Sequence, residues 1–437
     1  MFAERWRTLD ERTSPNHKRK IEMPCVPVRC FFRRYLHCCL VLWFMAVPLT
    51  AQAQLELRLS ESDGETLLIE AHGRGFKESC GNADGQLFGK NSGSIKTSED
   101  RYVQPLNSEA GDEAHYLKAA RMGGGIYIHL PYFFPAGPCK DVLIVVKARH
   151  ILWDGTWYAD RIELSRKLAQ HKSLFLTNEL RPVLRGGTYF DASIPAPTLS
   201  KLEARFATIL AFYRDVLKFE PMKNVGAVVA IVRNNGNYTG FGGDALNIIR
   251  MSYDNPSPQD LLTIDQIFPA TFAHELSHKL QSERLFAMPL ARHIVEGSAD
   301  FLKMLVLHSS GILDAVETRE RVLKAAAACA NAADTRSWSQ KTEQGAIRFR
   351  EPYDCGMTYY FVAYYSSGMT ATDFTAALRK AVTGISEYVE NPQTLCLLFE
   401  ASCENERLKT MVSNKSSYVR QTVWLEGKLH SVPILGR

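Results

Sequence analysis

His274, Glu275 and His278 form an H-E-x-x-H motif inside a stretch, 270–284, whose apolar spacing predicts a helix. Residues four apart project from the same face of a helix, so both imidazoles can reach one tetrahedral Zn²⁺ at about 2.0–2.1 Å. Glu275 stands beside the first histidine, where it can take a proton from a metal-activated water. The motif therefore predicts a hydrolytic zinc site, with Zn²⁺ as cofactor.

A catalytic zinc needs a third protein ligand and one open position. Glu296 follows the second histidine by 18 residues, in a second stretch, 290–309, that is also predicted to be helical. Two packed helices would bring Glu296 beside the imidazoles. Asp300 lies one turn further on, and we expect it to accept the free N–H of a ligand histidine. His293, one turn before Glu296, stays open as a rival ligand, although a helix-surface role is more common.

Together the two stretches resemble the gluzincin metallopeptidases, which pair H-E-x-x-H with a glutamate on the next helix. Residues 294–299, I-V-E-G-S-A, are similar to the L-x-E-G-x-A segment of the aminopeptidase branch, which includes the glycyl aminopeptidases. Glu296 and Asp300 match the glutamate-x-x-x-aspartate of the thermolysin branch. The resemblance covers roughly residues 200–380. It implies a general base, Glu275, and three zinc ligands: His274, His278 and Glu296.

A weaker similarity concerns the oxyanion. Residues 352–356, P-Y-D-C-G, resemble the aminopeptidase P-Y-x-K-G turn, whose tyrosine steadies the oxyanion of the transition state. The resemblance implies this role for Tyr353, with Tyr360 as the alternative. The lysine of that turn is Cys355 here. Aromatic packing of the same tyrosines on a C-terminal helix stays open as a second interpretation.

Residues 240–247, G-F-G-G-D-A-L-N, take the place of the edge strand that binds substrate backbone in this family. The resemblance implies a substrate-binding role for four of them: Gly243, Asp244, Ala245 and Asn247. The aminopeptidases also carry a glutamate, in G-x-M-E-N, that holds the substrate amine. No glutamate matches it here, and Asp244 is out of register, so endopeptidase and exopeptidase activity both stay open.

Hydrophobic patterning divides the chain after the first 53 residues. Residues 54–170 contain short alternating or apolar runs broken by glycine, which predict a β-rich N-terminal domain. Residues 171–310 contain an amphipathic helix, an apolar strand at 225–232 and the two stretches, 270–284 and 290–309, that carry the candidate zinc ligands. The resemblance implies that residues 171–310 form a thermolysin-like α/β core. Residues 311–437 are predicted to be a helical C-terminal region, so the fold class is α+β.

Residues 1–53 are typical of a leader. Two arginines precede 21 uncharged residues, 35–55, whose apolar centre gives way to a small-residue A-Q-A site. This pattern predicts a secretory signal peptide cleaved after Ala53, with no stable membrane insertion afterwards. A retained membrane anchor is the alternative. Translation can begin at Met1 or Met23. We therefore expect an exported protein, periplasmic or extracellular.

Six cysteines follow the leader. An even number of cysteines in an exported chain indicates disulfides, and six free buried thiols are the alternative. Each neighbouring pair falls within one apparent structural region. We therefore expect sequential pairing: Cys80–Cys139, Cys329–Cys355 and Cys396–Cys403.

The composition excludes several protein classes. With 46% hydrophobic and 23% charged residues, the 437-residue chain is not disordered, collagen-like or a polytopic membrane protein. The leader holds 9 of the 52 Lys and Arg but 4 of the 47 Asp and Glu, so the rest carries 43 of each sign. No basic run lies there to cover a phosphate backbone, and nucleic acid is not an expected partner.

These observations predict a zinc-dependent peptidase that acts on a peptide or protein substrate. Two other functions stay open. The first is a catalytically inactive, metal-free and exported binding module that keeps the peptidase fold, with recognition by the N-terminal β domain. The second is a membrane-tethered interaction protein that retains residues 35–55.

Overall fold

The computed structural model describes residues 55–62, 64–73, 80–81, 86–88, 94–106, 118–135, 137, 139, 141–185, 187–219, 225–233, 240–281, 291–332, 336, 340–341, 344–348, 350–383, 407–408, 411 and 415–431. Within Ala53–Arg437 the chain forms one compact unit. The predicted signal peptide and the predicted Cys396–Cys403 pair lie outside the described residues. Among the residues described, no helix combines the length and apolarity that crossing a membrane requires.

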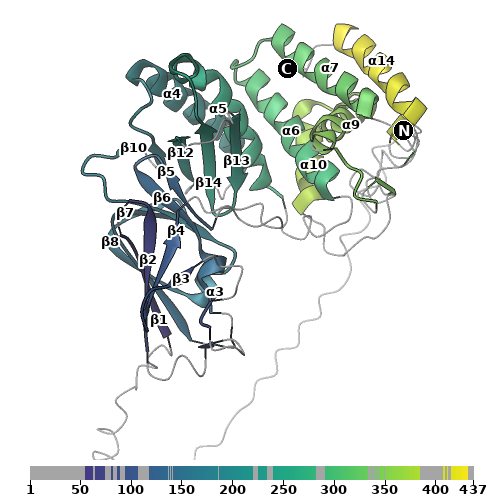
Figure 1. Cartoon of the computed structure of the whole chain (residues 1–437). Helices are drawn as coiled ribbons and strands as arrows, with labels where there is room; N and C mark the ends of the chain where they lie inside the picture. The colour runs from purple at the N-terminus through teal and green to yellow at the C-terminus, as the bar shows by residue number, and fades with distance from the viewer. Residues whose placement is uncertain are drawn as a thin grey trace, which may run out of the picture. The chain divides into compact units, whose positions relative to one another are not determined.

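The N-terminal part is built on one large sheet (Figure 1). Its strands are β1 (Leu55–Glu61), β2 (Thr66–His72), β3 (Ile95–Lys96), β4 (Arg101–Pro105), β5 (Ala119–Met122), β6 (Gly125–His129), β7 (Val142–Trp153), β8 (Thr156–Ser165) and β9 (Ser173–Thr177). They follow the order β3-β4-β2-β1-β7-β9-β6-β5, and β8 pairs with β7. Two short helices, η2 (Leu130–Phe133) and α3 (Arg166–Ala169), accompany the sheet.

Alternating side chains explain these strands. In β1, Leu55, Leu57 and Leu59 are fully buried while the residues between them are partly exposed, the period of a strand with one covered face. The predicted β-rich region is present. Strand β9 lies beyond the boundary expected at residue 170, because it pairs with β6 and β7 of the same sheet. The predicted Cys80–Cys139 disulfide is confirmed.

A second, five-stranded sheet follows. It contains β10 (Val183–Arg185), β11 (Thr188–Phe190), β12 (Gly226–Val232), β13 (Gly240–Ala245) and β14 (Ile248–Asp254), in the order β10-β11-β12-β14-β13. Strands β11, β12 and β14 are parallel, and β13 runs antiparallel to β14 at the edge. The central strand β12 is buried along nearly its whole length, which explains its uninterrupted apolar sequence.

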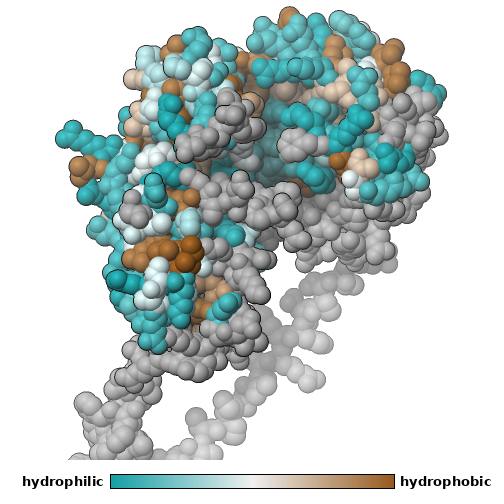
Figure 2. Space-filling model, viewed as in Figure 1, coloured by the Kyte–Doolittle hydropathy of each residue, from teal (hydrophilic) through white to brown (hydrophobic). Residues whose placement is uncertain are grey.

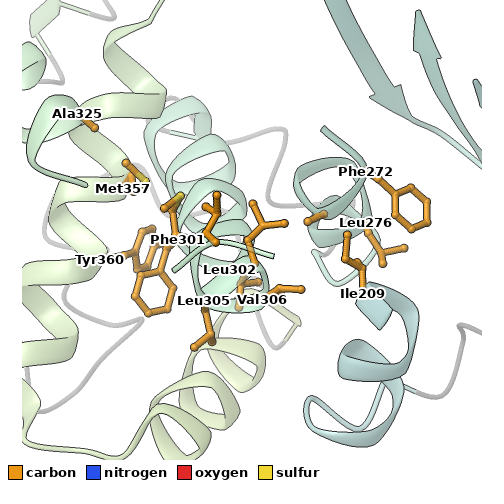
Figure 3. Close-up of a cluster of buried hydrophobic side chains, with 14 of the residues drawn as sticks. Ile209, Phe272, Leu276, Phe301, Leu302, Leu305, Val306, Ala325, Met357 and Tyr360 are labelled. Carbon is orange, nitrogen blue, oxygen red and sulfur yellow. The ribbon is translucent and has the colours of Figure 1, made fainter. Parts of the chain in front are cut away.

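Seven helices of thirteen residues or more account for most of the remaining described chain. They are α4 (Ala196–Asp215), α5 (Pro258–His278), α6 (Ala291–Ser309), α7 (Ala315–Ala332), α9 (Glu351–Ser367), α10 (Ala371–Thr383) and α14 (Lys415–Ser431). Helix α6 is central: Figure 3 shows its apolar side chains between those of α4 and α5 and those of α7 and α9. The mixed α and β class is confirmed.

Local sequence features fix the start and middle of α5. Ser257 and Asp260 form a capping box, and Pro258 occupies the first helical turn, where its missing N–H costs nothing. Pro269 lies inside the helix and cannot donate to the carbonyl of Asp265. The Arg205 guanidinium of α4 binds that carbonyl and also lies 3.1 Å from the Asp265 carboxylate. The two helices are therefore joined where a helical hydrogen bond is missing.

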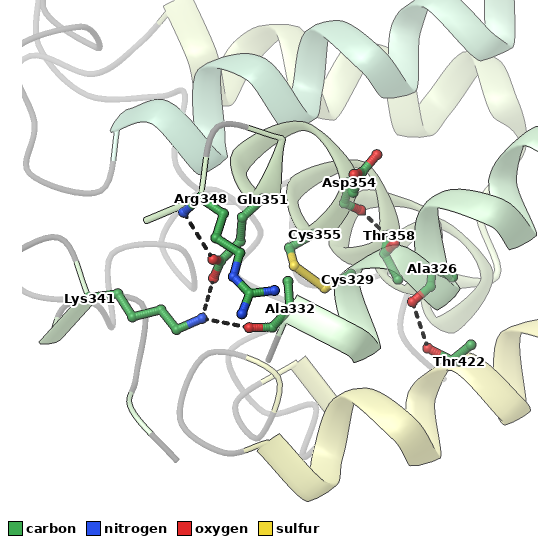
Figure 4. Close-up of a disulfide and its surroundings, with 10 residues drawn as sticks. All are labelled: Ala326, Cys329, Ala332, Lys341, Arg348, Glu351, Asp354, Cys355, Thr358 and Thr422. Carbon is green, nitrogen blue, oxygen red and sulfur yellow. Dashed lines mark hydrogen bonds and ion pairs between the residues drawn. A yellow bond between two sulfur atoms is a disulfide. The ribbon is translucent and has the colours of Figure 1, made fainter. Parts of the chain in front are cut away.

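A disulfide joins α7 to α9, and the predicted Cys329–Cys355 pair is thereby confirmed (Figure 4). Beside it, the buried Lys341 ammonium lies 2.7 Å from Glu351 and donates to the carbonyl of Ala332 at 2.9 Å. The N-terminal end of α9 is thus held by a buried ion pair through Glu351 and covalently through Cys355.

The visible face of the molecule is mostly hydrophilic or neutral, with separate hydrophobic patches (Figure 2). Single exposed apolar side chains are usual in folded proteins. One of them, Phe241, is 54% exposed and lies on the edge strand β13.

Candidate metal centre

Helices α5 and α6 bring three ligand-type side chains together. His274 and His278 project from one face of α5, with ring centroids 4.7 Å apart. Their Nε2 atoms are 3.0 Å apart, and Glu296 Oε2 of α6 lies 3.2 Å from the first and 3.5 Å from the second. Among the described residues, this is the group of His, Cys, Asp and Glu that could hold a metal ion.

The hydrogen bonds of the imidazoles determine which ring atoms face the cluster. His274 Nδ1 lies 2.6 Å from Asp300 Oδ1, and His278 Nδ1 lies 2.8 Å from Gln281 Oε1. Carboxylate and amide oxygens only accept hydrogen bonds, so each Nδ1 carries the proton. A neutral imidazole then presents an unprotonated Nε2. Two nitrogen lone pairs and a carboxylate oxygen therefore converge, an arrangement that requires a positive charge between them.

The pKa values of His274 and Glu296 agree with the need for a positive charge between the ligand atoms. Burial opposes a charged His274, but Asp300 and Glu296 outweigh it and raise its pKa to about 9. Burial also opposes a charged Glu296, yet the two imidazoles lower its pKa to about 2. Without a metal the cluster holds a proton, and a divalent cation competes with that proton for the same lone pairs.

The spacing of the ligand atoms fits a small tetrahedral cation. Ligands at about 2.0–2.1 Å from a tetrahedral ion are roughly 3.3 Å from one another. The three measured separations lie around that value. In addition, Glu296 Oε2 is buried and makes no hydrogen bond of good geometry. The two nitrogens and one carboxylate oxygen therefore form a suitable donor set for a metal.

Asp300 occupies the position predicted from its spacing, behind the first histidine. It is 3% exposed, and Lys303 of the same helix lies 2.5 Å from the carboxylate oxygen that His274 binds. Burial favours the neutral acid, but Lys303 and His274 keep its pKa well below the usual range. Asp300 is therefore an anion that orients the imidazole.

Glu275 lies against the edge strand β13. A Cβ on Gly243 would be 3.0 Å from Glu275 Oε1, so glycine at this position leaves room for the carboxylate. Glu275 is 6% exposed, and burial raises its pKa above the usual range, more than the neighbouring histidines lower it. Such a carboxylate is a stronger base near neutral pH than an exposed one.

Tyr353 of α9 lies beside the metal-ligand cluster. Its ring stacks on that of His274, with centroids 5.7 Å apart and planes at 29°. Burial and then the negative charge of Glu296 raise its pKa, so its hydroxyl stays protonated and can donate. The close approach of α9 to α6 depends on Gly297 and Gly356, because a Cβ on either would collide with the backbone of the other.

Two alternatives from the sequence do not reach the cluster. Tyr360 is fully buried, and its hydroxyl donates to the carbonyl of Ile294 at 3.4 Å, so it packs in the core. His293 is also buried, at 1% exposed, and burial lowers its pKa to about 3. It does not belong to the group that could hold a metal, within the part of the chain that is described.

The predicted substrate-binding residues separate into two pairs. Gly243 and Ala245 lie on the edge strand β13, as expected. The side chain of Asp244 instead pairs with Arg250 at 2.6 Å and accepts from the Tyr127 hydroxyl at 3.3 Å. The Asp244 side chain is thus occupied within the fold, and the predicted binding of a peptide through the backbone of this edge strand stays a prediction.

The side chain of Asn247 is also occupied within the fold, and its predicted substrate-binding role likewise stays a prediction. Its amide oxygen accepts from the backbone N–H of Ser173 at 2.6 Å, and its amide nitrogen donates to the Ser173 carbonyl at 2.7 Å. The side chain makes the pair of hydrogen bonds that a neighbouring strand would make, and it connects the second sheet to β9 of the first. Its role is therefore to join the two sheets.

Two residues of the centre were not predicted from the sequence. Gln281 follows His278 by three residues, and Lys303 follows Asp300 by three. Asp300 and Lys303 lie three apart on α6 and meet on its surface, so that spacing was an available signal. Gln281 instead lies in the turn after α5, where its N–H donates to the His278 carbonyl at 3.2 Å. The spacing could not reveal that both side chains turn toward the cluster.

Comparison with known protein families finds no matching family, and comparison with curated proteins finds no match either.

Proposed function

We propose that the protein is a zinc-dependent peptidase in which Glu275 is the general base. One observation carries this proposal: two imidazole nitrogens and a carboxylate oxygen converge at tetrahedral spacing beside a buried glutamate. Three such donors, two nitrogens and one carboxylate oxygen, suit a catalytic zinc, because that ion keeps its fourth position open for water or substrate. The resemblance of the two helices to the gluzincins supports the same function.

The chemistry follows from the positions of the side chains. Zinc held by His274, His278 and Glu296 would polarise the scissile carbonyl and lower the pKa of a water toward about 7. Glu275 takes the proton of the attacking water and delivers it to the departing amine nitrogen. The Tyr353 hydroxyl donates a hydrogen bond to the developing oxyanion, a contribution of about 3–4 kcal/mol in comparable sites.

The edge strand β13 supports a peptide as substrate. It is bonded to β14 on one side, and the sheet order ends with it. An extended peptide can add to such an edge through backbone hydrogen bonds. Gly243 places this strand directly against Glu275, so a bound peptide would pass beside the general base.

Cleavage of a peptide library, followed by mass spectrometry, tests the proposal. We expect products that disappear with a chelator and return when zinc is restored. Gently purified protein that contains almost no zinc and cleaves no peptide would instead support the inactive, metal-free binding module. Sequencing the N-terminus of the mature protein tests export: a start near Gln54 indicates signal cleavage, and an intact residue 35–55 segment indicates the anchor.

Export is supported by the two disulfides, which persist in oxidising compartments.

A further inference from the structure

Gln281 connects the second histidine to the helix that carries the third ligand. Its amide oxygen lies 2.8 Å from His278 Nδ1. Its amide nitrogen donates to the carbonyl of Val295 at 2.7 Å and to Ser298 Oγ at 2.8 Å. Val295 immediately precedes Glu296, so one carboxamide joins the end of α5 to the turn of α6 that presents the carboxylate.

The partners fix the orientation of the carboxamide. A backbone carbonyl only accepts, so the group that faces Val295 must be the amide nitrogen. The amide oxygen is then the group that faces His278, and its partner Nδ1 must carry the proton. Rotation of the amide by half a turn would place two oxygens in contact at Val295 and two donors at the imidazole. The contacts of α6 therefore determine the tautomer of a residue on α5.

We infer that Gln281 is a positioning residue for the metal centre, which keeps His278 in the tautomer that exposes the Nε2 lone pair. This inference rests on the proposed zinc site. The two histidines are held differently: His274 by a carboxylate, which Lys303 neutralises, and His278 by a neutral amide. A neutral acceptor fixes the ring without adding another negative charge to a cluster that contains Glu296.

Zinc affinity, measured by competition with a chromogenic chelator, separates positioning from simple packing. Gln281→Met keeps the length of the side chain and removes both the acceptor and the donors. We expect it to weaken zinc binding about 10- to 100-fold, the usual effect of losing a group that orients a metal ligand. Gln281→Glu keeps the acceptor for Nδ1 but places a second oxygen against the Val295 carbonyl, so its zinc affinity should lie between those of Gln281→Met and the original protein.

Ser298→Ala is the matched control, because it removes one acceptor of the Gln281 amide but leaves the bond to His278 intact. Its zinc affinity should be almost unchanged. Long-range ¹H–¹⁵N spectra of the metal-free protein give an independent readout. They should show His278 protonated at Nδ1 in the original protein and in Gln281→Glu, and a mixture of tautomers in Gln281→Met.

Equal losses of zinc affinity in Gln281→Met and Gln281→Glu, in parallel with their thermal unfolding temperatures, would overturn the inference and leave Gln281 as a link between helices. Unchanged affinity in Gln281→Met would overturn it as well. If the original protein binds no zinc, both the inference and the proposed function fail. If it binds zinc but cleaves no peptide, only the peptidase function fails, and the affinities still decide the role of Gln281.

Discussion

Glu275 is the residue whose replacement separates proton transfer from metal binding. Glu275→Gln keeps the size of the side chain but removes the base. We expect zinc content to stay at one ion per chain while kcat falls roughly 10²- to 10⁴-fold, the usual contribution of a general base. Metal analysis beside steady-state kinetics checks this. A variant that retains zinc and full activity would remove Glu275 from the mechanism.

Glu296 supplies the only carboxylate that lies within 3.5 Å of both histidine Nε2 atoms, among the described residues. Glu296→Ala leaves two ligands, and we expect it to lose zinc. Since a ligand that binds only the folded state stabilises it, at a zinc concentration of about 100 Kd the variant should also lose about 2.7 kcal/mol of unfolding free energy. Thermal unfolding with and without zinc measures both effects.

The exposed Glu320 of α7 offers a matched control for that substitution. Glu320→Ala removes the same charge from a helix surface, and its zinc content and zinc-dependent stabilisation should equal those of the original protein. Retention of zinc by Glu296→Ala would move the third ligand elsewhere.

Two of the tyrosines of α9, Tyr353 and Tyr360, can be compared directly. Tyr353→Phe removes the hydroxyl proposed to donate to the oxyanion, and we expect kcat to fall roughly 10²- to 10³-fold with zinc affinity unchanged. Tyr360→Phe removes a hydroxyl that lies in the core, 3.4 Å from the carbonyl of Ile294. It should lower stability slightly and leave kcat nearly constant. Similar kinetic losses in both variants would contradict the assignment.

At the scale of the helices, the position of Tyr353 depends on how α9 is held. The Cys329–Cys355 disulfide joins α9 to α7 just beyond this tyrosine and closes 26 residues. Replacing both cysteines by serine should cost about 2–4 kcal/mol of unfolding free energy. We also expect kcat to fall, because the N-terminal end of α9 becomes less constrained. Denaturant unfolding and kinetics under the same conditions measure the two losses.

The second disulfide is the control for that experiment. Cys80–Cys139 lies with the N-terminal sheet, and its removal should reduce stability without changing the environment of Tyr353. If both double variants lowered kcat equally relative to their stability, the disulfide of α9 would have no specific effect on the site.

At the scale of the whole molecule, the N-terminal sheet supports the strand that lies against the general base. Asn247 makes two hydrogen bonds to the buried backbone of Ser173, and Asp244 accepts from Tyr127. Asn247→Ala leaves a buried N–H and a buried carbonyl without these partners, and we expect a loss of about 2 kcal/mol or more. Urea unfolding checks this.

Asn178→Ala is its matched control, because Asn178 also bonds through both amide atoms but is exposed. Its unfolding free energy should change by less than about 0.5 kcal/mol. Equal losses in the two variants would mean that the connection between the sheets contributes no more than a surface hydrogen bond.

The residues that carry the proposed chemistry could be predicted where the signal is local. His274 and His278 share a face of α5 because residues four apart in a helix project from the same side. Glu296 and Asp300 share a face of α6 for the same reason. The alternating leucines of β1 and the apolar run of β12 likewise indicated strands. Two of the three predicted disulfides are confirmed, because each pair lies within one structural region.

Contacts between distant segments could not be predicted in this way. Asp244 and Asn247 have side chains suited to a substrate, yet they bind the N-terminal sheet, since Tyr127 and Ser173 occupy their hydrogen bonds. The choice between Tyr353 and Tyr360 also depended on the packing of α9 on α6.

The sequence by itself therefore determined the ligand types and their spacing within each helix, because these depend on a period that every α-helix has in common. The tertiary structure alone decided that Glu296 meets the imidazoles, that Tyr353 stacks on His274 and that Gln281 donates to the Val295 carbonyl of α6. Those contacts join segments far apart in the chain, and their geometry depends on close packing, such as that of Gly297 against Gly356, which no local pattern specifies.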